Sequence, residues 1–196
     1  MTTTQIPSSS WTADQLKLDR YRVNENMKAS NRNFSKQVLP VIMASSSFVS
    51  YTCCETASLE TLEKDLDRKF GIDYILHRPD GTQAQCMVRM TVKDNFTIRT
   101  ATRGFSESEF QKRLRQWANG ELSRNVSYIH GVQNQSKTKT THFYIVNAYE
   151  LYTAVQDNRV EYEKCKNAED NSEYVAITPK AVADAGISIR KVVVKS

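Results

Sequence analysis

The chain of 196 residues is long enough for one domain with its own hydrophobic core and too short for two domains of ordinary size. Apolar residues make up 39% and charged residues 25%, with six glycines and four prolines, which excludes disordered and collagen-like proteins. No window reaches the roughly 18 consecutive apolar residues of a membrane helix, and the N-terminus lacks the pattern of a secretory signal, so we expect a cytoplasmic protein without a membrane partner.

The cysteines and the charges narrow the class of protein further. The four cysteines include the adjacent pair Cys53 and Cys54 and show no C-x-x-C spacing, which predicts reduced thiols rather than a disulfide framework or a zinc site. The net charge of +5 is uneven, because residues 89–139 contain ten Lys and Arg against four acids. Such a window is typical of a surface that faces an anionic polymer, although a solvated basic face without a partner gives the same pattern.

The first third of the chain is the least regular. Residues 1–35 are polar and predict a peripheral arm that can be helical, followed by one α/β domain over residues 36–196. Residues 37–51, QVLPVIMASSSFVSY, are apolar but interrupted by Pro40, which favours a buried connector or a short strand. Residues 58–70 give the clearest helix of the chain, with leucines at helical spacing.

A hairpin is the clearest strand signal. Residues 72–78 and 83–92 predict two antiparallel strands about a Pro-Asp-Gly turn, because proline fixes φ and the glycine accepts a positive φ. A third strand is expected over residues 95–102.

The second half of the chain alternates helix and strand. A basic helix is predicted over residues 106–120, where Ser106 and Glu109 fit a capping box and Gly120 fits a C-terminal stop. After it we expect a strand over residues 126–133, a strand running into a short helix over residues 141–155, an exposed acidic stretch over residues 158–173, and then a strand, a short helix begun by Thr178 and Pro179, and a final strand.

This order of elements resembles the PD-(D/E)XK nuclease superfamily. The resemblance rests on DRKFGIDYIL, on the hairpin, on SESEFQKRLRQW and on THFYIVNAYEL, and it spans about residues 55–155. It implies a restriction-endonuclease-like fold, which is a single α/β domain with a central mixed β-sheet flanked by helices. It also implies a protein that binds DNA or RNA, and a Mg²⁺-dependent endonuclease of the kind that suits a phage or another mobile element.

The site that the resemblance implies is built on the hairpin. Cleaving a phosphodiester at neutral pH requires a divalent metal that lowers the pKa of a bound water. In families of this fold an aspartate at the start of the second strand is a metal ligand, and Asp73, which should face about Val88, fits that position. The (D/E)-x-K element then falls at Met87-Val88-Arg89, with methionine in place of the acid and Arg89 in place of the lysine. A register shifted by two residues makes Gln85 the ligand instead.

The catalytic set implied in this way is Asp73, Gln85 and Arg89, with Mg²⁺ held by Asp73 and completed by Glu63 and Asp67 on the preceding helix. Each member also has a structural alternative. The helix acids can form a solvated edge, Asp73 can cap backbone N–H groups, and Arg89 can pair with Asp73 as a salt bridge. If the degenerate motif has lost its activity, the protein is an inactive nuclease fold that acts through nucleic acid or through protein partners.

The basic window is assigned to the binding of DNA or RNA. Because each cation that neutralises a phosphate releases a counterion, binding through this surface should weaken steeply with salt. The residues expected to contact phosphates are Arg99, Arg103, Lys112, Arg113, Arg115, Arg124, Lys137 and Lys139.

Overall fold

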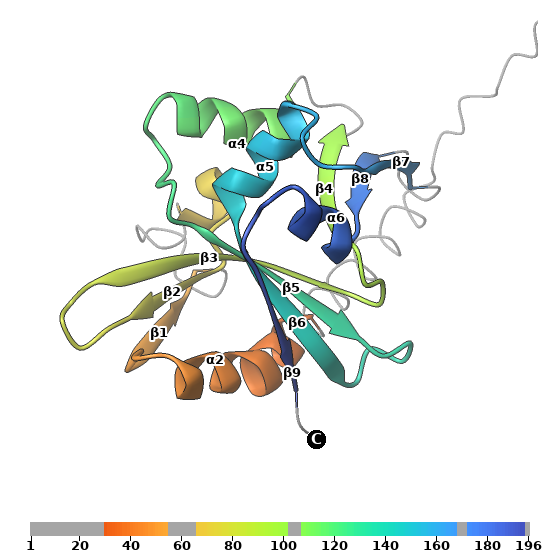
Figure 1. Cartoon of the computed structure of the whole chain (residues 1–196). Helices are drawn as coiled ribbons and strands as arrows, with labels where there is room; N and C mark the ends of the chain where they lie inside the picture. Colours follow the sequence, from red (N-terminus) through yellow and green to blue (C-terminus); the bar gives the residue numbers. More distant parts are fainter. Residues whose placement is uncertain (1–29, 55–65, 102–106, 168–171, 195–196) are drawn as a thin grey trace, which may run out of the picture.

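The computed structural model of the chain describes residues 30–54, 66–101, 107–167 and 172–194, which are drawn in colour in Figure 1. The helices are the two π-helical turns η1 (Phe34–Val38) and η2 (Leu66–Phe70), and the α-helices α2 (Leu39–Ser45), α4 (Glu109–Ala118), α5 (Ala148–Gln156) and α6 (Pro179–Asp184). The strands are β1 (Ser50–Cys53), β2 (Tyr74–His77), β3 (Gln83–Thr91), β4 (Phe96–Ala101), β5 (Ser127–Gln133), β6 (Thr140–Asn147), β7 (Glu163–Lys166), β8 (Glu173–Ile177) and β9 (Ile189–Val193).

A central sheet of six strands has the order β1-β2-β3-β5-β6-β9. In this sheet β3 and β5 run parallel, whereas the other neighbours run antiparallel. A parallel pair requires a crossover connection, and residues 92–126 supply it with β4 and α4. The predicted α/β class with a central mixed sheet flanked by helices is therefore confirmed.

The central sheet carries a hydrophobic core on each face, because successive side chains along a strand point to opposite sides. Cys86 of β3 packs with Phe34 of η1 on one face, and Met87 packs with Trp117 of α4 on the other. Figure 1 shows α2 against the first face and α4, α5 and the second sheet over the opposite face. Arg89, two residues after Met87, therefore lies on the face that α4 covers.

The N-terminal elements differ from expectation. Residues 30–33 are already helical, and Phe34 is fully buried, so the end of the predicted arm belongs to the core. Residues 1–29 lie outside the described residues. The expected connector over residues 37–51 is mostly helix, and β1 follows it. Pro40 is tolerated because it lies in the first turn of α2, where no N–H is needed for a hydrogen bond within the helix.

The predicted hairpin of β2 and β3 is confirmed. His77 pairs with Gln83, and Gly81 has the expected positive φ of 81°. The Asp80 carboxylate accepts hydrogen bonds from the N–H and the hydroxyl of Thr82, at 2.9 and 2.7 Å, which closes the turn. Asp73 directly precedes β2, as the resemblance implied.

A second sheet has the order β4-β8-β7. The expected third strand is confirmed as β4, and it pairs with β8 in this second sheet. Its apolar residues Phe96 and Ile98 are buried against the central sheet, so β4 covers that sheet rather than extending it. The stretch over residues 158–173 is mostly exposed in its described part, as expected, and it contains β7, which also pairs with β8.

Two simpler expectations concern cysteines and membranes. No disulfide joins the four cysteines, all of which lie within the described ranges. Among the helices of those ranges, none has the length and the apolar character needed to cross a membrane.

Candidate active-site cavity and basic groove

A tight chain reversal brings Asp73 to the start of β2. After η2 the N–H of Gly71 donates to the Asp67 carbonyl at 2.9 Å, and Gly71 adopts a positive φ of 62°. The next residue, Ile72, is fully buried and anchors the chain in the core. The backbone of Asp73 is then fixed on both sides, because its N–H donates to Cys86 of β3 and its carbonyl accepts from Cys54.

Arg113 supports this reversal from inside the protein, which corrects its assignment to the phosphate-binding surface. It is only 5% exposed and donates to the Lys69 carbonyl at 2.7 Å and to the Gln116 side chain at 2.8 Å. A Cβ added at Gly71 would overlap its guanidinium group. Burial lowers the pKa of Arg113, and the acids around it oppose that shift. Arg113 therefore holds the end of η2 and cannot reach a bound polymer.

The carboxylate of Asp73 is locked to β3. Its Oδ2 accepts a hydrogen bond of 2.6 Å from the N–H of Val88, so the expected proximity of Asp73 to Val88 is confirmed. This bond also realises the backbone-capping alternative for Asp73. A carboxylate that accepts one hydrogen bond can still bind other groups, because its two oxygens offer about four lone-pair positions.

A small cavity, which we call the Asp73 cavity, lies between β3, β4 and the start of α4. Its volume is about 150 Å³. Its charged and hydroxyl-bearing lining residues include Asp73, Arg89, Arg99, Glu109, Tyr128 and Tyr152.

Glu109 is the member of the Asp73 cavity that sequence reasoning missed. The sequence assigned it to a capping box with Ser106, whereas the structure forms the box between Ser108 and Gln111. The Ser108 hydroxyl accepts from the Gln111 N–H at 3.2 Å, and the Gln111 side chain accepts from the Ser108 N–H at 3.0 Å. Glu109 is therefore the first residue of α4, takes no part in the cap and lines the cavity. Gly120 follows the helix with a positive φ of 71°, as expected.

Two buried tyrosines form the inner wall of the Asp73 cavity. The hydroxyl of Tyr128 donates to the Thr97 carbonyl at 3.0 Å. Burial raises the pKa of both Tyr128 and Tyr152, so both phenols stay protonated at neutral pH. Among the described residues that line the cavity, the charged groups are therefore two carboxylates and two guanidinium groups.

Of the other predicted metal ligands, those within the described residues do not line the Asp73 cavity. Gln85 lies on the same face of β3 as Met87 but nearer the turn, and it does not line the Asp73 cavity. Asp67 belongs to η2 and does not line the cavity either, while Glu63 lies outside the described residues. Within the described ranges, no cluster of three or more His, Cys, Asp or Glu is placed to hold a metal ion.

A wider hollow of about 360 Å³, which we call the basic groove, opens beside the Asp73 cavity. The two share Arg89, Thr97 and Arg99 as lining residues. Lys93 and Lys137 add two further cations to the groove, and none of the described residues that line it is acidic. Of the predicted phosphate contacts, the groove thus contains Arg99 and Lys137, and it adds Lys93 and Arg89.

The backbone of the two groove lysines is fixed by hydrogen bonds to its carbonyl groups. The Lys137 carbonyl accepts a hydrogen bond of 2.6 Å from the buried Asn33, so the N-terminal helix fixes the loop between β5 and β6. The Lys93 carbonyl accepts from the buried ring of His130 at 3.1 Å and from the Thr91 hydroxyl at 2.8 Å. These bonds fix the positions from which the two flexible side chains start.

The remaining predicted phosphate contacts lie elsewhere. Arg115 is exposed on α4 and paired with Glu107 at 2.9 Å, and Lys112 lies on the same helix. Arg124 lies over the ring of Tyr149, at 4.8 Å from its centroid. Lys139 lines a separate hollow beside α2, and Arg103 lies outside the described residues.

Comparison of the chain with protein-family models, with curated proteins and with solved structures found no match.

Proposed function

We propose that this protein binds DNA or RNA in the basic groove and presents a phosphodiester to the Asp73 cavity, as a cytoplasmic member of the PD-(D/E)XK type. The observation that carries the proposal is the junction of the two hollows. Four cations surround a groove whose described lining has no acid, and that groove opens into a cavity with two carboxylates. A groove lined by positive charges attracts a polyanion, while carboxylates at its end bind a metal cation or a proton.

The two arginines at the junction suit a phosphate group. Arg89 and Arg99 line both hollows, together with Lys93 and Lys137 in the groove and with Asp73 and Glu109 in the cavity. A guanidinium group binds two phosphate oxygens at once and stays charged at every working pH. Arg89 and Arg99 would therefore orient a phosphodiester with its reactive face toward Asp73 and Glu109.

The residues of the cavity fit one Mg²⁺ only if the substrate completes its shell. Asp73 and Glu109 would hold the ion, and Mg²⁺ commonly takes one or two carboxylates together with waters and substrate phosphates. When bound, the ion would lower the pKa of a water and neutralise developing charge. Arg89 cannot accept a proton, so the proton of the attacking water would pass to a carboxylate of the cavity. Met87, in the position of an acid, offers a thioether that does not bind Mg²⁺.

Binding is tested by the salt dependence of affinity. Each phosphate contact contributes about −0.7 to −0.9 to the slope of log K against log salt, so four groove cations predict a slope of about −3. Lys93→Gln and Lys137→Gln should each reduce that slope by almost one, measured by fluorescence anisotropy with labelled DNA and RNA. Arg115→Gln is the matched control, because this exposed arginine lies outside the groove. Equal effects of all three changes, or no binding at low salt, would refute the groove.

Cleavage is tested separately with Asp73→Asn and Glu109→Gln in Mg²⁺ or Mn²⁺. Both changes should abolish the cutting of single- or double-stranded substrates while the free energy of unfolding and the affinity for nucleic acid stay nearly unchanged. If Asp73 instead exists to pair with Arg89, Asp73→Asn should leave nucleic-acid cleavage unchanged and lower the free energy of unfolding by at most about 1 kcal/mol, because Arg89 is exposed and Asp73 is half-buried.

The alternative function is an inactive nuclease fold that acts through nucleic acid or a protein partner. The observation that favours it is Met87 and Arg89 at the positions of the acid and the lysine. A wild-type protein that binds nucleic acid but cuts none of these substrates establishes this alternative.

A further inference from the structure

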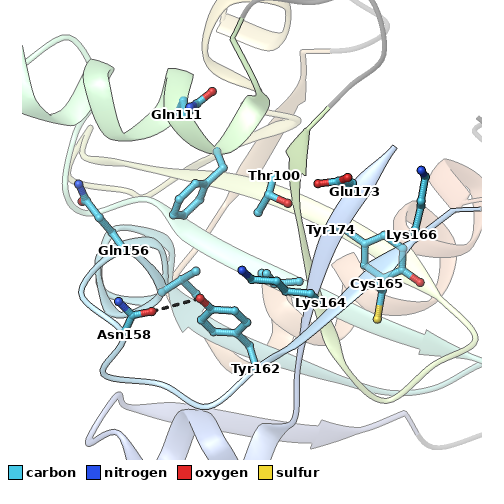
Figure 2. Close-up of a pocket in the computed structure, with 13 residues that line it drawn as sticks. Thr100, Gln111, Gln156, Asn158, Tyr162, Lys164, Cys165, Lys166, Glu173 and Tyr174 are labelled. Atoms are coloured by element: carbon cyan, nitrogen blue, oxygen red, sulfur yellow. Dashed lines mark hydrogen bonds between the residues drawn. The ribbon is translucent and has the colours of Figure 1, made fainter. Parts of the chain in front are cut away.

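A third hollow adjoins the basic groove, between α4, the end of α5 and strands β7 and β8 (Figure 2). We call it the tyrosine pocket. Its volume of about 610 Å³ is of the size that holds a small organic group. The lining residues that matter here are Phe110, Gln156, Tyr162, Lys164, Lys166 and Tyr174.

Three half-buried aromatic rings give the tyrosine pocket flat apolar faces. Phe110 is backed by Tyr152, with the two rings stacked and their centroids 5.7 Å apart. The hydroxyl of Tyr162 donates to the Asn158 side chain at 3.1 Å, a bond drawn in Figure 2, which fixes the tilt of that ring. Rings held in this way can stack on a planar partner without first losing much conformational freedom.

The charges of the tyrosine pocket favour an anionic ligand. Lys164 and Lys166 are exposed and lie two residues apart on β7, and Figure 2 shows Lys164 directed toward Tyr162 and Lys166 nearer Tyr174. Glu173 is the acid among the described lining residues. Amide side chains such as Gln156 both donate and accept hydrogen bonds, as the edge of a nucleobase requires.

Tyr174 joins the tyrosine pocket to the basic groove, because it lines both. It pairs with Arg99 across β4 and β8, and residues that face each other in an antiparallel pair lie on the same side of the sheet. A chain whose phosphates contact Arg99 therefore has the ring of Tyr174 on the same side of the second sheet, and the tyrosine pocket begins at that residue.

We infer that the tyrosine pocket takes an unpaired base, so that the ligand of this protein is single-stranded nucleic acid. The inference rests on the proposed binding of nucleic acid in the basic groove and adds its strandedness. A cationic groove for the backbone combined with aromatic rings for the bases is the arrangement by which proteins bind single strands. The bases of an intact duplex stay stacked on one another and cannot reach the rings.

The test compares two ligands and two substitutions at one position. The ligands are a labelled oligothymidylate of about 12 nucleotides, which is within the usual range of single-strand site sizes, and a duplex of equal length. Tyr162→Leu removes the ring but keeps an apolar side chain, and Tyr162→Phe keeps the ring but removes the hydroxyl. Anisotropy should show that Tyr162→Leu weakens the binding of the single strand about tenfold, whereas Tyr162→Phe stays within about twofold of the wild type.

The outcomes separate this inference from the proposed function. If Tyr162→Leu changes nothing, or weakens both ligands equally, while Lys93→Gln still lowers the salt slope, the tyrosine pocket is refuted and the groove stands. If Lys93→Gln is also without effect, both proposals fail. Lys164→Gln is the second variant, since this side chain is exposed and its removal leaves the core intact. It should weaken the single strand more than the duplex, and the reverse order would overturn the inference.

Discussion

The stability of this protein should fall in mild acid because of His130. The ring is fully buried beside Phe96, with the ring centroids 5.1 Å apart. Its Nε2 donates to the Lys93 carbonyl, which leaves Nδ1 as the nitrogen that a second proton must occupy. Nδ1 has no hydrogen-bond partner among the described residues. Burial lowers the pKa of His130 from its ordinary 6.5 to about 4, against a smaller opposing effect of the Lys93 carbonyl.

The size of the effect follows from this difference in pKa. Between pH 6.5 and about 4 the unfolded chain binds a proton at His130 that the native protein does not bind, so the free energy of unfolding falls as the pH falls. Each unit of pKa difference corresponds to about 1.4 kcal/mol, which makes the loss about 3 kcal/mol below pH 4. At pH 7 this contribution is fully present.

Urea unfolding at a series of pH values, on the wild type and on His130→Gln, measures this effect. Glutamine can still donate to the Lys93 carbonyl but does not titrate, so carboxylate titrations common to both proteins cancel in the difference. The wild type should lose about 3 kcal/mol more than the variant between pH 7 and pH 4. Parallel pH profiles for the two proteins, or an NMR titration of the native His130 ring near pH 6.5, would refute the reasoning.

Two further predictions concern the support of Asp73. Gly71→Ala should cost more stability than Gly186→Ala in thermal unfolding: both glycines have a positive φ, which costs about 1 kcal/mol, but only the Cβ at Gly71 meets the Arg113 guanidinium. Equal losses would show that the Arg113 side chain moves away from the new Cβ without a loss of stability. Arg113→Gln should lower the free energy of unfolding by about 1–3 kcal/mol, because the buried Gln116 side chain and the Lys69 carbonyl both lose a charged donor, whereas Arg115→Gln should stay within about 0.5 kcal/mol of the wild type. Similar losses of stability for the two arginine variants would show that Arg113 is not a buried structural residue.

Local patterns were sufficient to predict the hairpin. The Pro-Asp-Gly turn and the alternation after it depend on neighbours in sequence, and both β2 and β3 formed as expected. The same holds for the last helix, where the Thr178 hydroxyl accepts from the Ala181 N–H at 3.1 Å as an N-cap. The pairing of β4 and β7 with β8 in a second sheet depends on contacts between distant segments, which local patterns do not encode. In addition, β7 lacks the alternation of apolar and polar residues that predicts a strand.

The site was predicted in part. The position of Asp73 at the start of β2 was predicted because glycine followed by an apolar strand is a local signal. The position of Glu109 in the cavity was missed because the predicted helix cap was two residues too early. The burial of Arg113 did have a signal in the sequence. Phe110, Leu114 and Trp117 form the apolar stripe of α4, and position 113 falls within that stripe at helical spacing. Counting charge without this periodicity assigned Arg113 to the surface.

The parallel pairing of β3 with β5 has a consequence for folding kinetics. The crossover over residues 92–126 carries Arg99 and Glu109, whereas Arg89 lies on β3 before it. The acid and basic groups of the cavity therefore meet only after a long loop has closed, and contacts of that kind form slowly. During synthesis Asp73 and Arg89 leave the ribosome before Arg99 and Glu109, and the hairpin alone is at best marginally stable. The proposed binding of nucleic acid should thus become possible only late in folding, when β5 pairs with β3.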